Sequence, residues 1–82
     1  MSQCKITLNA GETKSVYVRG HKTEPDRCLL IEVTGAGSIS GASGTAKFTV
    51  QNGDGLFLEP GGGSTTVTAQ KDKATTLVVS FV

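Results

Sequence analysis

The chain has 82 residues and a mass of 8.4 kDa, enough for one small domain over residues 1–82 and too little for a second. Its net charge is +1, which argues against a nucleic-acid-binding face or a polybasic membrane surface. With 11 Gly, 11 Thr, 8 Val and 3 Ile, the composition favours strands and turns over helices. A core of this size rarely contributes more than about 3–5 kcal/mol unless a covalent link or an oligomer assists it.

Apolar and polar residues alternate in seven short segments from one end of the chain to the other. A period of two is the pattern of strands that bury one face, and no segment shows the period of a helix. The alternating apolar residues are, in chain order, Ile6 and Leu8; Val16 and Val18; Leu29, Ile31 and Val33; Ala46, Phe48 and Val50; Leu56 and Leu58; Val67 and Ala69; and Leu77, Val79 and Phe81.

Turn-forming residues separate these segments. The runs NAG at 9–11, NGDG at 52–55 and GGGS at 61–64 permit the positive φ that tight connections need. KDK at 71–73 predicts a polar hairpin, and residues 20–27, with Pro25, and 35–44 predict two longer loops. Seven strands joined in this way predict an antiparallel sandwich or, as an alternative, a small Greek-key barrel.

The second half of the chain carries GTAKFTVQNG at 44–53, then Leu56 and Val67, and ATTLVVSF at 74–81. These segments resemble bacterial immunoglobulin-like repeats of the invasin and intimin kind, which pair an xFxVxxG strand with a late, Thr-containing strand. The resemblance implies a seven-stranded immunoglobulin-like β-sandwich without the Cys–Trp–Cys core of antibody domains, because the chain has no Trp. Such domains occur in adhesins, as accessory modules of cell-wall enzymes and as head and tail decorations of phage virions.

Cys4 and Cys28 form one possible disulfide. The bridge would close a loop of about 25 residues and would stabilise the fold by roughly 3 kcal/mol through the unfolded chain. The alternative is two separate small hydrophobic residues, each near the start of a strand. Because His21 is the single histidine, a four-ligand zinc site is not expected. We predict no metal and no cofactor.

The run TGAGSISG at 34–41 is similar to the nucleotide-binding loop of short-chain dehydrogenases. However, Ile39 stands where that pattern has its middle glycine. The loop must also open a helix whose N-terminus holds the phosphates, whereas the residues that follow predict a strand. The motif therefore predicts a turn rather than a nucleotide site.

Two further groups of polar residues suggest chemistry only weakly. Asp54 lies in a run similar to a calcium loop, but no other carboxylate follows until Glu59, so a glycine-rich hairpin turn is the simpler interpretation. The alternative is a weak cation site that joins Asp54, Glu59 and a distant acidic residue. His21, Glu24 and Asp26 could form a base and its orienting groups, but their nucleophile would be a Ser, Thr or Cys brought in by the fold, and any Thr-rich chain offers such a residue by chance. We therefore predict that the protein is not an enzyme.

The alternation also predicts apolar residues on the outer faces, of which Tyr17, Leu30 and Val78 are the candidates for a docking face. Leu30 and Val78 lie on strands that look central. Such residues can form a patch covered by a partner or a sister subunit, or can be scattered surface hydrophobes. The last strand, residues 75–82, has no polar tail and predicts an exposed edge that a neighbouring chain could extend.

These observations predict a non-catalytic structural or binding module that docks on a larger protein or forms a homo-oligomer. Nucleic-acid and membrane partners are not expected. No stretch approaches the roughly 18 apolar residues of a membrane span, and the segment MSQCK lacks the apolar region of a signal peptide. A chain that begins with Met and has no export signal fits a virion decoration best, located in the virion or in the host cytoplasm during assembly.

Two alternatives remain. A lectin-like, carbohydrate-binding module would need exposed aromatic residues, but the chain has no Trp, and the alternation places Phe48 and Phe81 inside. A small inhibitor held by the bridge between Cys4 and Cys28 would be a monomer that loses activity on reduction.

Overall fold

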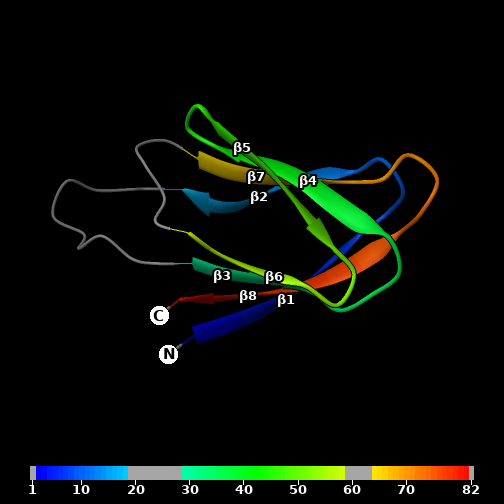
Figure 1. Ribbon diagram of the computed structural model, residues 1–82, viewed down its shortest axis with the longest axis horizontal. Helices are drawn as coiled ribbons and strands as arrows, with labels where there is room; N and C mark the ends of the chain where they lie inside the picture. The colour runs from blue at the N-terminus through cyan, green and yellow to red at the C-terminus, as the bar shows by residue number, and fades with distance from the viewer. Residues whose placement is uncertain (1, 19–28, 59–63, 82) are drawn as a thin grey trace, which may run out of the picture.

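The computed structural model describes residues 2–18, 29–58 and 64–81, which form eight strands and no helix (Figure 1). The strands are β1 (Ser2–Leu8), β2 (Thr13–Val18), β3 (Leu29–Val33), β4 (Ser38–Ser43), β5 (Ala46–Gln51), β6 (Gly55–Leu58), β7 (Ser64–Ala69) and β8 (Thr75–Phe81).

The strands form two antiparallel four-stranded sheets, with the order β1-β8-β3-β6 in sheet A and β2-β7-β4-β5 in sheet B. Each strand of the first half pairs with one of the second half: β1 with β8, β2 with β7, β3 with β6 and β4 with β5. The chain is therefore one long hairpin, folded at the β4–β5 turn, that winds through both sheets. Eight strands in this order make a jelly roll.

The structure confirms an antiparallel β-sandwich but does not confirm the seven-stranded immunoglobulin-like arrangement. In an immunoglobulin constant-type domain the first two strands share a sheet, whereas here β1 and β2 lie in different sheets. The additional strand, β4, lies in the segment 35–44 that was predicted to be a loop. Its sequence, SISGAS, contains a single large apolar residue, Ile39, and therefore shows no alternation. The sheets are separate, so the alternative of a closed barrel is not what forms.

The hydrophobic core lies between the two sheets. Ile6, Val16, Phe48, Leu56 and Leu58 are partly buried and pack against it. The fully buried members are Leu8, Leu29, Ile31, Val33, Ile39, Val50, Val67, Ala69, Leu77 and Val79. All of these except Ile39 belong to the alternating residues of the predicted strands, so the inward faces are confirmed at these positions. Ala46, which was also predicted to face inward, is exposed at the start of β5.

The glycine-rich turn predicted at 52–55 is confirmed, but the prediction that it closes a hairpin is wrong, because it joins β5 in sheet B to β6 in sheet A. Gly53 has φ of +89°, and the backbone N–H of Asp54 donates to the carbonyl of Gln51 at 3.0 Å. The N–H of Gly53 donates to the carbonyl of Val33 at 2.9 Å, which ties the turn to the end of β3. Asp54 therefore belongs to a structural turn at the sandwich rim.

Two predictions for the C-terminal half are wrong. The residues Lys71–Lys73 do form part of a polar turn, but β7 and β8 lie in different sheets, so the turn does not close a hairpin. The last strand is not an exposed edge, because β8 lies between β1 and β3. The edge strands of sheet A are instead β1 and β6. The winding of the hairpin places the first strand, β1, beside the last, β8, so β8 has a neighbour on each side.

In the nucleotide-like run at 34–41, Gly35 is required by close packing against β8. The N–H groups of Thr34 and Gly35 both donate to the carbonyl of Thr76, at 2.9 and 3.1 Å. A Cβ at Gly35 would lie 2.7 Å from the backbone nitrogen of Thr76, so the chain can pass β8 at this distance only with glycine. The run leads into β4 rather than a helix, which removes the phosphate-binding geometry.

Candidate functional site

The outer face of sheet A consists of two rows of side chains that run across all four strands. The pairing register fixes which residues lie opposite one another, and alternation places them on the face away from the core. The first row, in the strand order β1-β8-β3-β6, is Gln3, Ser80, Leu30 and Phe57; the second is Lys5, Val78, Glu32 and Gly55. Ser80 is buried, with 2% of its surface exposed, so it offers no free surface in the first row.

Three residues form an apolar patch that reaches from the centre of this face to the edge strand β6: Leu30, Phe57 and Val78. Leu30 and Phe57 are directly paired across β3 and β6, and Val78 lies on β8, the strand on the other side of β3. Phe57 is 61% exposed, the one large hydrophobic residue so exposed among those that the structure describes, while Leu30 and Val78 are half-buried. An exposed aromatic ring beside two aliphatic side chains is typical of a surface that another molecule covers.

Two charged residues flank the apolar patch. Lys5 and Glu32 pair with Val78 from opposite sides, on β1 and β3, and both are exposed. Glu32 extends toward β6, because a Cβ at Gly55 would lie 3.4 Å from its Cγ and 3.7 Å from Leu30 Cδ1.

The structure brings together only part of the predicted docking face. Leu30 and Val78 lie on the two central strands of sheet A, as the alternation indicated. Tyr17 lies in sheet B, where it pairs with Thr65 beyond a register shift between Ser15 and Tyr17, so it does not belong to the same face. Phe57 was not predicted as part of the site, although its position between Leu56 and Leu58 already indicated an outward direction.

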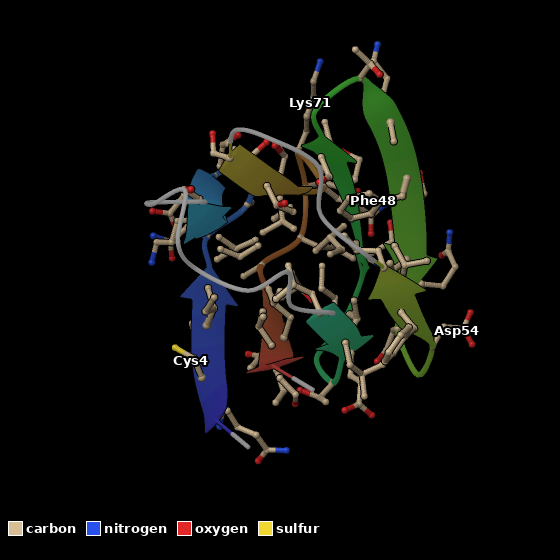
Figure 2. The ribbon with its side chains drawn as sticks, turned by 90° about the vertical axis from the view of Figure 1, so that its left-hand side faces the viewer. Cys4, Phe48, Asp54 and Lys71 are labelled. Atoms are coloured by element: carbon tan, nitrogen blue, oxygen red, sulfur yellow. The ribbon has the colours of Figure 1, made fainter. Side chains whose placement is uncertain are left out.

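The outer face of sheet B carries an open groove of about 510 Å³. The hydroxyls of Thr13 and Thr68 lie 2.7 Å apart beside it, and none of the four strands of sheet B contains Asp or Glu. Figure 2 marks Phe48, which is half-buried on β5. The groove is lined by Ser40, Gly41, Ala42, Lys47, Phe48, Thr49, Thr66 and Thr68.

The remaining predicted residues form no site in the part of the chain that the structure describes. Cys4 is exposed on β1 and Asp54 at its turn, on opposite sides of the molecule in Figure 2. Cys28 lies outside the described residues, so the disulfide stays a prediction. The proposed base and its orienting groups, His21, Glu24 and Asp26, lie outside them too, as does Glu59.

Among the described residues, no three His, Cys, Asp or Glu side chains gather where they could hold a metal ion. Within residues 2–18, 29–58 and 64–81, no helix has the length and hydropathy to cross a membrane.

The fold is similar to that of a protein built by design. No family model matches the chain, and no curated protein matches it in sequence. The structure aligns over the whole of both chains, with a TM-score of 0.75 and 16% sequence identity, with the solution NMR structure of a de novo designed double-stranded β-helix. This likeness agrees with the winding of the paired strands described above. At such low identity it shows the fold alone, and the resemblance to invasin-type repeats stays a prediction.

Proposed function

We propose that the protein is a non-catalytic binding module that docks on a larger protein through the outer face of sheet A. The observation that carries this proposal is the apolar patch of Leu30, Phe57 and Val78. The outer face of an antiparallel sheet that meets water is normally polar, so three neighbouring apolar side chains on one such face, from the edge strand β6 to the central strands β3 and β8, favour a covered surface. Burying two of them on docking would contribute about 3–5 kcal/mol.

The proposed setting is a virion or a surface assembly. It is supported by analogy of fold, since jelly rolls occur in viral capsid proteins and in lectins, and a fold by itself does not assign a function.

A photo-crosslinking experiment tests the docking face. We expect Phe57→p-benzoylphenylalanine, expressed in the cells that make the protein, to give a discrete adduct with one larger protein, because the ring at this position would lie in the interface. Thr49→p-benzoylphenylalanine, on the outer face of sheet B, is the matched control and should give none. Adding Val78→Asp should remove the adduct from position 57, since it places a charge in the apolar patch. The same adducts from both positions, or none from either, would contradict the proposal.

The groove on sheet B favours a second candidate function, the binding of carbohydrate. Its hydroxyl groups can both donate and accept hydrogen bonds, and its volume lies within the range of small-molecule sites. Against it, the one aromatic residue in the lining, Phe48, packs against the core between the sheets, so its ring offers no surface on the outer face on which a sugar could stack.

A glycan array followed by NMR titration tests this candidate. If sugars bind in the groove, Thr49→Val/Thr68→Val should reduce affinity at least about tenfold, because each substitution leaves the volume nearly unchanged and removes a hydrogen-bonding group. Thr7→Val, on the outer face of sheet A, should leave affinity unchanged. An array without hits would reject the carbohydrate function.

A further inference from the structure

The open edge of β6 is the least protected of the edge strands that the structure describes. These are β1 and β6 in sheet A and β2 and β5 in sheet B. An open edge offers unpaired backbone groups to any extended chain, and proteins protect it with lysines, bulges or a short strand. β1 carries Lys5, β2 carries Lys14 and a register shift, and β5 carries Lys47. β6 has the sequence GLFL and is protected only by its length of four residues.

The hydrogen bonds of β3 determine which backbone groups of β6 point to this edge. The N–H of Val33 donates to the carbonyl of Asp54, the residue before β6, at 3.1 Å. The N–H of the next residue, Thr34, donates instead toward β8. In an antiparallel ladder every second residue bonds to the same neighbouring strand. The two leucines of β6 therefore bond to β3, and the N–H and C=O groups of Gly55 and Phe57 point to the open edge.

Apolar side chains surround these open backbone groups. Phe57 projects onto the outer face of sheet A, where it is 61% exposed. Leu56 and Leu58 project toward the core but stay half-buried. A strand added beside β6 would place one set of side chains beside the Phe57 ring and the other set beside the two leucines. The edge and the apolar patch therefore form one continuous surface that fits an extended segment with apolar side chains.

We infer that the larger protein binds by strand addition, in which an extended apolar segment of that protein pairs with β6 and continues sheet A beyond this edge. This inference rests on the proposed function, because it names the part of the partner that meets the apolar patch. The added strand bonds to the backbone of Gly55 and Phe57, and it enlarges the docking surface from one face to a face and an edge. Since so short a strand allows few backbone bonds, contact with the Phe57 ring provides most of the selectivity.

A displayed library of short linear peptides, selected on the purified chain, tests the strand addition. We expect the selected peptides to be rich in apolar residues and to slow hydrogen exchange of the Gly55 and Phe57 amides at least about tenfold, because both N–H groups become bonded. The amide of Lys5, on the opposite edge of sheet A, is the matched control and should exchange at an unchanged rate. It points to the open edge of β1, as does the carbonyl of Thr7, which accepts a hydrogen bond from Lys14 Nζ at 3.2 Å.

Two variants separate the backbone bonds from the ring. An ester in place of the amide of Phe57, made by incorporating phenyllactic acid, removes one edge N–H and keeps the ring. It should weaken peptide binding about three- to tenfold. Phe57→Lys gives β6 the charge that the other three edges carry and should abolish binding. Both changes lie at an open edge and an exposed side chain, so circular dichroism should show the wild-type fold.

The outcomes separate this inference from the proposed function. A library without any binding peptide, peptides that leave the exchange of the Phe57 amide unchanged, or an ester variant that binds them like the wild type would each overturn the strand addition. A discrete photo-adduct from position 57 together with any of these results would leave the docking on a larger protein standing, through side chains alone. Peptide binding at β6 without any adduct would reject the larger partner and retain the peptide-binding edge.

Discussion

Replacing Leu77 with alanine is expected to leave a large part of the protein unfolded at room temperature. Leu77 is fully buried on β8, a central strand, where it pairs with Ile6 on one side and Val33 on the other. Truncating such a residue costs about 2–5 kcal/mol through lost burial and the cavity left behind. A core of this size seldom supplies more than about 3–5 kcal/mol in all, so the substitution removes most of the stability.

The measurement is urea unfolding followed by far-ultraviolet circular dichroism, because the chain has no Trp for fluorescence. Thr76→Ala is the matched control, since it shortens the adjacent side chain on the opposite face of the same strand, where it is half-buried. We expect the midpoint to fall by roughly 1–3 M urea for Leu77→Ala and by much less for Thr76→Ala. Equal shifts for the two variants would contradict the placement of the core between the sheets.

The sequence was sufficient to assign the strands and their inward faces wherever apolar residues alternate with polar ones. β3 is the clearest case: Leu29, Ile31 and Val33 are buried, while Glu32 is exposed and Leu30 only half-buried. A period of two is a local property of the chain, and it is enforced by burying one face. Where that local signal is missing, the strand was not predicted. β4 contains Gly41 and Ala42 in place of large apolar residues, and its extended conformation is supported by hydrogen bonding to β5 on one side and β7 on the other.

The order of the strands could not be predicted from local patterns. In sheet A, β1 pairs with β8 at the other end of the chain, and the register aligns Lys5 with Val78. Such pairings depend on how the whole hairpin winds through the two sheets. The sequence of a single segment does not determine that winding. The same limit affected the polar turn at Lys71–Lys73, whose residues indicate a turn but not which sheet each flanking strand joins.

The candidate site was partly predictable for the same reason. Leu30 and Val78 were identified from alternation, but Phe57 becomes their neighbour only through the pairing of β6 with β3. Tyr17 was wrongly grouped with them, because alternation identifies an outward direction and not the sheet to which a strand belongs. The irregular register between Ser15 and Tyr17 also interrupts the alternation on which that assignment depended.

Substituting alanine for Gly41 is expected to destabilise the domain by about 1–3 kcal/mol, which lowers Tm by roughly 5–20 °C. A Cβ at this position would lie 2.4 Å from Phe48 Cζ and 2.6 Å from the carbonyl oxygen of Thr66. Glycine thus permits the close approach of the Phe48 ring to the backbone of β4. At an unobstructed strand position the same substitution would stabilise the fold, because it restricts the unfolded chain.

Gly55→Ala supplies that comparison. Its Cβ would meet nothing closer than Glu32 Cγ at 3.4 Å, so we expect a change between zero and a gain of about 1 kcal/mol. The double substitution Gly41→Ala/Phe48→Leu separates the two obstacles at Gly41, since a shortened side chain removes the ring contact but not the Thr66 carbonyl. Stability below that of Phe48→Leu alone would identify the backbone of β7 as the obstacle that cannot move. A stabilising effect of Gly41→Ala itself would contradict the close packing of Phe48 over β4.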